Sequence, residues 1–279
     1  MIETTDLMRI KPGVDNFDWL KTFAIIMVVV DHTGYFFIAD AAWWSVFGRL
    51  AAPVFFFLLG YARSRIVPFH WILFGIILTL LDSWNTNLQW VAPNILLSLA
   101  LIRLSRPSIL SLLQRHGWVA FSVVILGLLL VLPFAGDLVD FGAEGWLWAL
   151  FGLCQRMYVD GRSFSSVDET LQKSELTRQG MKQDWRMMRL LACLITAVVY
   201  VRQEQIEFGF LDSQLTVVAI GVAILSCVLS MFSSGPSRVQ PPQPMASALQ
   251  WLGRHTLEIY VIQLAGSELI IKLIPGLAA

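Results

Sequence analysis

The sequence predicts an all-α protein, a polytopic transmembrane bundle of about nine helices with eight to ten as the acceptable range. Three observations predict this fold. The 279 residues are 56% hydrophobic and only 14% charged, with a mean hydropathy of +0.66, and a soluble protein of this size could not bury so much apolar surface. Several apolar runs approach or reach the length that crosses a bilayer. The basic residues are concentrated in alternate connecting segments.

The expected spans follow the apolar runs along the chain. They are residues 18–39, 44–62, 67–82, 88–104, 118–136, 143–158, 187–202, 213–232 and 250–274. Two stretches are too polar to cross a membrane. Residues 159–186 predict a loop of mixed charge, and the Pro-rich residues 233–247 predict a linker that cannot sustain a helix. The sequence thus divides into a short N-terminal segment, residues 1–17, and one transmembrane domain, residues 18–275.

The basic residues predict a cytoplasmic N-terminus. The chain has 20 Lys and Arg, and sixteen of them fall on one side of the membrane if the N-terminus is inside. Only Arg202 and Lys272 fall on the other side, while Lys21 and Arg49 lie within spans. In this orientation the loop 159–186 is cytoplasmic. The net charge is zero, so we expect no nucleic acid as a partner. The apolar spans imply that membrane lipids surround the protein.

The first span carries three ionisable residues that are costly in a bilayer. Lys21 lies at its cytoplasmic edge, and Asp31 and His32 lie ten and eleven residues further on. Eleven steps of about 100° return Lys21 and His32 to nearly one helix face, roughly 16 Å apart along the axis. Ionisable groups inside a membrane are functional candidates by default. Asp31 and His32 point about 100° apart, which leaves Asp31 free to pair with another span.

Two further polar residues are predicted at the depth of His32. The first hairpin turns near Asp40, so His32 and Arg49 lie at similar distances before and after the turn. Asn94 enters the fourth span at a comparable depth. We therefore expect His32, Arg49 and Asn94 to line one cavity, with Asp31 close to Arg49. Lys21 and Arg254 are expected at the cytoplasmic face.

Each of these residues also has a structural interpretation. Lys21 and Arg254 can extend to the lipid headgroups, and Asp31 and Arg49 can form a buried ion pair that locks two helices. Asn94 can serve as an interhelical hydrogen-bonding residue. A neutral His32 can also be structural, although a neighbouring carboxylate and an arginine at the same depth favour acid–base chemistry.

The motifs of the first two spans resemble those of a known group of membrane enzymes. The Lys21-x10-His32 frame is similar to the basic-x10-His signature of the acyltransferase-3 family, with lysine for the usual arginine. The closer resemblance is to the TraX family of pilin acetylation proteins within the same broad group. The segments that carry it are Leu20-Lys21, Asp31-His32-Thr33-Gly34 and Gly48-Arg49-Leu50-Ala51-Ala52-Pro53. The segment around Asn94 matches more loosely, and Gln263 stands where acyltransferase-3 proteins commonly have histidine.

The resemblance implies an acyltransferase-like domain in a bacterial cytoplasmic (inner) membrane. Such a protein moves an acyl group, usually acetyl, from cytoplasmic acetyl-CoA or another acyl-CoA to a hydroxyl or amine acceptor at or across the membrane. The acceptor would be a glycan, a lipid or a protein N-terminus.

The resemblance also implies roles for individual residues. His32 would be the general base or a transient acyl carrier, with Asp31 beside it. Arg49 or Asn94 would stabilise the oxyanion, and Lys21 and Arg254 would attract the CoA phosphates. No cluster has metal-ligand spacing, so no metal is expected.

Two other classes of function use the same residues. A non-catalytic membrane subunit of a larger complex could retain an acyltransferase-like scaffold, and the short loops are compatible with such a role. A proton-coupled transporter would also use Asp31, His32 and Arg49. A transporter would be expected to show broken helices near the midplane or an internal repeat, and the sequence indicates neither.

Overall fold

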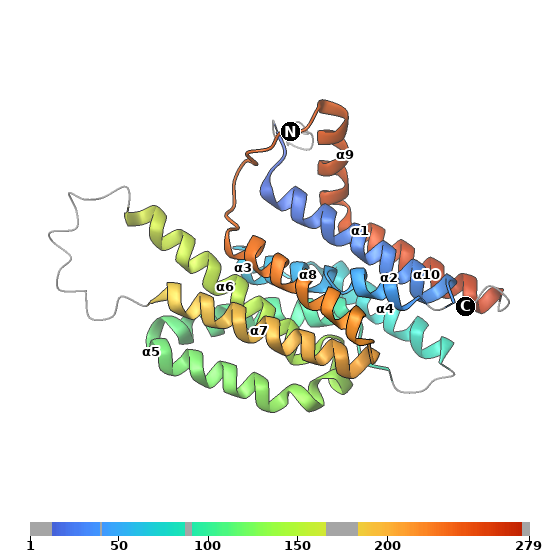
Figure 1. The fold of residues 1–279 in the computed structure, drawn as a ribbon, viewed down its shortest axis with the longest axis horizontal. Coiled ribbons are helices and arrows are strands. Elements are labelled where there is room, and N and C mark those ends of the chain that lie inside the picture. The colour runs from blue at the N-terminus through green and yellow to red at the C-terminus, as the bar shows by residue number, and fades with distance from the viewer. Residues whose placement is uncertain (1–12, 40, 87–90, 166–183, 275–279) are drawn as a thin grey trace, which may run out of the picture.

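The computed structural model describes residues 13–39, 41–86, 91–165 and 184–274. The described residues form helices joined by short connections, which confirms the all-α prediction (Figure 1). The helices are α1 (Asn16–Phe37), α2 (Ala42–Gly48), α3 (Ala51–Tyr61), α4 (Phe69–Asn85), α5 (Ile95–Leu138), α6 (Gly142–Ser165), α7 (Trp185–Phe208), α8 (Asp212–Ser230), α9 (Gln243–Arg254) and α10 (Thr256–Leu273). Four helical segments within the described residues are long and apolar enough to cross a membrane: Asn16–Phe37, Ala42–Tyr61, Ile95–Gly136 and Asp212–Ser230.

Helix α5 is a hairpin of two helices. Its 44 residues would extend about 66 Å if straight, twice the thickness of a hydrocarbon core. Gly117 breaks it with φ +56° and ψ −127°, a backbone conformation that glycine adopts without steric cost. The hydroxyl of Ser98 donates to the carbonyl of Asp140 at 2.6 Å, so the two ends of the hairpin lie together. The separate spans predicted over 88–104 and 118–136 correspond to its two arms.

The second predicted span, residues 44–62, is interrupted at the site. Helix α2 ends at Gly48 and α3 begins at Ala51, with Arg49 and Leu50 between them. Pro53 lies in the first turn of α3, where its missing N–H leaves no hydrogen bond unmade. The break places Arg49 at a junction between two helices rather than on the face of one.

Helix α6 occupies the centre of the bundle and contacts α3, α5 and α7. Its buried side chains include Trp148 and Phe151, both without exposed surface. Glycines allow α3 and α6 to approach closely. A methyl group on Gly60 would collide with the carbonyl of Ala149, and one on Gly152 would collide with the carbonyl of Phe57. This reciprocal arrangement is the small-residue packing common between membrane helices.

We expect Gly60→Ala to destabilise the protein by about 1–3 kcal/mol, because neither backbone can yield to the added methyl group. Gly127→Ala is the matched control, since a methyl group there would meet no atom within 4 Å. Its effect should be neutral or slightly stabilising, because alanine favours a helix more than glycine does. The measurement is the thermal midpoint of each variant in detergent. Equal midpoints for the two variants would contradict the close packing of α3 and α6.

The C-terminal part consists of two helices joined at a sharp bend. Helix α9 stands at a steep angle to α10, which runs alongside α1 (Figure 1). Helix α9 begins at Gln243, inside the segment 233–247 that was predicted as a linker, and ends at Arg254. The last predicted span, 250–274, therefore contains the end of α9 as well as α10. Asp40 and residues 166–183, which belong to the predicted hairpin turn and cytoplasmic loop, lie outside the described residues.

Candidate active site

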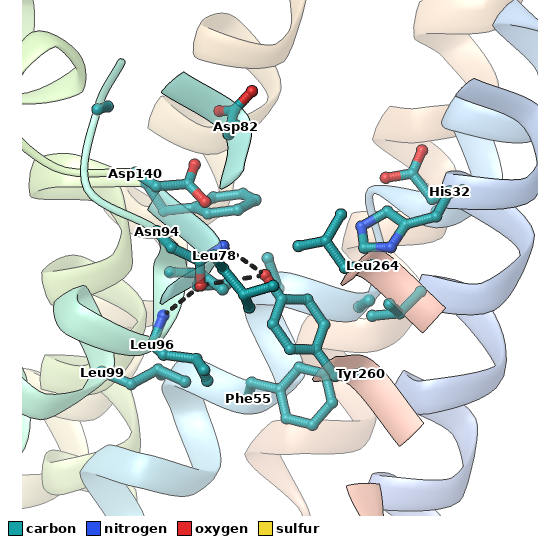
Figure 2. A pocket seen from close by; sticks show the side chains of 18 of the residues that line it. His32, Phe55, Leu78, Asp82, Asn94, Leu96, Leu99, Asp140, Tyr260 and Leu264 are labelled. Atoms are coloured by element: carbon teal, nitrogen blue, oxygen red, sulfur yellow. Dashed lines mark hydrogen bonds between the residues drawn. The ribbon is translucent and has the colours of Figure 1, made fainter. Parts of the chain in front are cut away.

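A single cavity of about 1160 Å³ brings together most of the residues that the sequence singles out. Its lining includes Lys21, Asp31, His32, Arg49 and Asn94. The volume exceeds the roughly 300–1,000 Å³ usual for a small-molecule site. Figure 2 shows His32 on one side of the cavity and Asn94 with Asp140 on the other, with Tyr260 between them.

Arg49 lies between two buried carboxylates. Its guanidinium forms an ion pair with Asp31, and its Nε lies 3.9 Å from Oε2 of Glu204. The side chains of Arg49, Asp31 and Glu204 are 14%, 10% and 1% exposed. The ring of Phe208 covers the guanidinium, with 4.4 Å from Cζ to the ring centroid, and Tyr200 donates to the Arg49 carbonyl at 2.6 Å. Two carboxylates and an aromatic ring thus hold the guanidinium of Arg49, and Tyr200 holds its backbone.

Two glycines of the sequence motifs make the Asp31–Arg49 contact possible. A methyl group on Gly48 would overlap the side chain of Asp31, and one on Gly34 would overlap that of Trp44. Each glycine therefore lets α1 and α2 approach to a distance that no larger residue allows. The Asp-His-x-Gly and Gly-Arg patterns therefore let α1 and α2 pack closely enough for Asp31 to reach Arg49.

His32 is oriented by α10. Its Nδ1 lies 2.8 Å from Oε1 of Gln263. An amide oxygen accepts hydrogen bonds, so this contact favours the tautomer with the proton on Nδ1 and the lone pair on Nε2. The ring centroid of Tyr260 lies 5.8 Å from that of His32. This tautomer is the one in which Nε2 can act as a general base.

Asn94 is the N-cap residue immediately before α5 and does not lie inside a span. Its Oδ1 accepts from the backbone N–H of Leu96 at 3.1 Å and so caps the helix. This bond fixes the amide, which points Nδ2 at the hydroxyl of Tyr260 at 2.9 Å. The prediction placed Asn94 several residues inside the fourth span, but Pro93 before it favours an extended backbone, and the helix begins only at Ile95.

Acidic side chains surround the end of the cavity beyond His32. They are Asp82, Asp140, Glu207 and Glu268. Asn85 donates to Oε2 of Glu268 at 2.6 Å. Asp140 lies in the loop between α5 and α6, where burial raises its pKa to about 6, with Glu207 adding to the effect and Arg49 opposing it. Four carboxyl groups thus gather at this end of the cavity.

Asp140→Asn should stabilise the protein at pH 8 by up to about 3 kcal/mol. The folded carboxyl binds its proton near pH 6 and the unfolded one near pH 3.9. The folded state therefore binds more protons between these values, so its stability falls as the pH rises through this window. The advantage of Asn over Asp should shrink as the pH drops below 6 and vanish near pH 4. Thermal midpoints across this range test this, and a constant difference would refute it.

The two cations predicted to attract a phosphate-bearing donor separate in the structure. Lys21 lines the cavity, whereas Arg254 lies exposed on the last turn of α9 and is not among the lining residues. Arg103 of α5 lines the cavity instead. Its guanidinium lies over the ring of Trp71, 5.0 Å from the centroid.

Glu204 is a site residue that the sequence interpretation missed. The prediction ended the seventh span at residue 202 and assigned Glu204 to an outer loop, but α7 continues to Phe208. The sequence did contain a pattern that marks Glu204 as buried. Met188, Ala192, Thr196, Tyr200 and Glu204 recur at every fourth position and are all buried in the structure. The regular spacing places Glu204 on the buried face although it is acidic.

Comparison with known proteins identifies the first half of the chain. A family model described as TraX protein matches residues 16–164, more than half of the 279 residues. An uncharacterised protein of Rickettsia prowazekii (strain Madrid E) is 33% identical over 84 residues, which cover 30% of this chain and 34% of that protein. The chain thus matches about a third of that relative's length. No solved structure matches significantly. The matched region includes His32, Arg49 and Asn94 but not α7 or α10.

Proposed function

The chain belongs to the TraX protein family, and on that premise we propose that it is an integral membrane acyltransferase that uses acyl-CoA. The observation that carries the proposal is the contact of His32 with Gln263 inside the cavity. The Nδ1 of His32 lies 2.8 Å from Gln263 Oε1, which favours a free lone pair on Nε2, and His32 lines a cavity of about 1160 Å³. A structural histidine would need no such free lone pair.

The reaction is acyl transfer from a thioester to a hydroxyl or amine. His32 Nε2 takes the proton of the acceptor as its oxygen or nitrogen attacks the thioester carbonyl. The tetrahedral intermediate then collapses, the carbon–sulfur bond breaks, and the imidazolium returns the proton to the departing thiolate. Acetyl is the acyl group that the motif resemblance favours.

Tyr260 is the best-placed donor for the oxyanion. Both residues expected in this role are already engaged: Arg49 by Asp31, and the amide of Asn94 by Leu96 and Tyr260. Asn94 Nδ2 donates to the Tyr260 hydroxyl at 2.9 Å, and the hydroxyl donates to Asn94 Oδ1 at 3.3 Å, so its proton would turn from this longer contact to the oxyanion. Its ring lies beside that of His32. Asn94 and Arg49 then position the site rather than contact the reacting carbonyl.

The proposal is tested with purified protein in lipid nanodiscs and acetyl-CoA labelled in its acetyl group. A glycan, a lipid and a peptide with a free N-terminus are offered separately as acceptors. The expected result is release of CoA with equal transfer of label to one acceptor class. Failure with all three classes and with membrane extracts would favour a non-catalytic subunit.

A further inference from the structure

Five arginines gather where the C-terminal end of α3 meets α5 and α6. We call them the arginine cluster: Arg63, Arg65, Arg103, Arg106 and Arg156. Arg106 is only 5% exposed and donates to the carbonyl of Ala62, to which Arg156 also donates at 3.1 Å. The charges of Arg65, Arg103 and Arg156 all act on Arg106.

Capping of α3 explains only part of this cluster. The last carbonyls of a helix need donors, and Arg106 and Arg156 supply them. A helix terminus carries about half a negative charge, which cannot balance five guanidinium groups. Among the described residues Asp160 is the one carboxylate that pairs with the cluster, at 2.8 Å from Arg63 and 3.3 Å from Arg156. The cluster therefore holds a large excess of positive charge.

Two donors of the cluster are buried without a partner in the described structure. They are the Nε groups of Arg103 and Arg106. An unsatisfied buried donor on a charged group costs roughly 1–3 kcal/mol or more, and like charges packed together add repulsion. An anion bound beside these groups would satisfy both demands. Planar guanidinium groups bind phosphate with two parallel hydrogen bonds, so a phosphate is the matching anion.

The cluster adjoins the cavity. Arg103 lines it together with Trp71 and with Lys21 on α1. Lys21 and His32 are eleven residues apart on α1, roughly 16 Å along the helix axis. An extended pantetheine arm, which separates the thioester of acyl-CoA from its diphosphate, spans a distance of this size. A donor with its thioester at His32 would therefore place its phosphates near Lys21, in the cavity that Arg103 also lines.

We propose that the arginine cluster, with Lys21, binds the phosphate groups of the acyl-CoA donor. This inference rests on the proposed acyltransferase function and assigns the donor site to α3, α5 and α6 instead of Arg254. Lys21 and Arg103 line the cavity. Arg106 and Arg156 do not line it, but they add positive charge next to Arg103 and hold the end of α3 through the Ala62 carbonyl.

Binding of CoA, 3′-dephospho-CoA and pantetheine to the protein in phosphatidylcholine nanodiscs tests the proposal. Arg103→Gln and Arg65→Gln are the variants, because neither residue caps α3. We expect each to weaken CoA binding at least tenfold, to weaken dephospho-CoA binding less and to leave pantetheine binding unchanged. Arg115→Gln is the matched control, an exposed arginine of the same hairpin outside the cluster, and should bind CoA normally.

Turnover separates failure of this inference from failure of the proposed function. With acetyl-CoA, Arg103→Gln should raise KM and leave kcat nearly unchanged, whereas with acetyl-pantetheine it should match the wild type. CoA binding and turnover that are unaffected in both cluster variants would overturn the phosphate site but leave the acyltransferase intact. Binding of phosphatidylglycerol vesicles through the cluster, without loss of CoA affinity in the variants, would also overturn it and identify a lipid headgroup as the ligand.

Discussion

Replacement of His32 by alanine is expected to reduce acyl transfer by about 10²–10⁴-fold, the usual contribution of a general base. The loss should appear in kcat, because the imidazole acts on the reacting proton rather than on either substrate's binding. The protein should still insert and fold, since His32 is only partly buried and, within the described residues, its side chain hydrogen-bonds with Gln263. Labelled acetyl transfer and size-exclusion profiles measure the two properties.

Gln263 provides the control for this prediction. Gln263→Leu removes the acceptor that holds the proton on Nδ1, so the rate should fall by less than in His32→Ala. Gln263→Glu keeps an acceptor at Nδ1 and should retain more activity than the leucine variant. If His32 served only as a structural contact, both Gln263 variants would behave alike. Full activity of His32→Ala would overturn the role of His32 and favour the accessory-subunit interpretation.

The sequence predicts the part of the site that rests on local chain geometry. The depth of His32 and Arg49 follows from counting residues across one hairpin, and the structure places both at one cavity with Asp31 paired to Arg49. Such counting works because helix rise is constant and the connection between α1 and α2 is short. The glycines at 34 and 48 strengthen the result, because they fix how closely the two helices approach.

Features that depend on distant helices could not be predicted. The pairing of His32 with Gln263 joins α1 to α10 across 231 positions, and helix order in a bundle is not encoded in hydropathy. Glu204 was excluded because its charge ended the apolar run, although an arginine on another helix compensates it. Arg254 was included because it is basic at a helix end, but the bend at His255 points α9 away from the α10 axis.

The second large effect is expected at Arg49. Arg49→Leu leaves Asp31 and Glu204 buried with no cation between them. Removing one partner of a buried ion pair costs about 3–5 kcal/mol, because the remaining charge is neither solvated nor paired. We therefore expect a large fall in thermal midpoint and in the yield of folded protein. Arg49→Lys should fold better but lose activity, since an ammonium group cannot make the fork of contacts that a guanidinium makes.

A series of neutralised variants distinguishes a structural from a functional arginine. If Arg49 paired with Asp31 alone, Asp31→Leu combined with Arg49→Leu would restore stability. Glu204 lies 3.9 Å from Arg49 and is 1% exposed, so this double variant still buries one uncompensated carboxylate. Addition of Glu204→Gln should recover more stability than the double variant does, because the triple variant leaves none of these three charges in place.

Activity of the triple variant decides the role of Arg49. A bundle that is stable again but inactive would mean that the Asp31–Arg49–Glu204 set shapes the cavity for catalysis, since the structural need for charge would have been removed. A triple variant that is both stable and active would mean that the three residues only hold α1, α2 and α7 together. Wild-type stability of Arg49→Leu alone would contradict the buried pairing itself, because an uncompensated carboxylate cannot remain in this environment without cost.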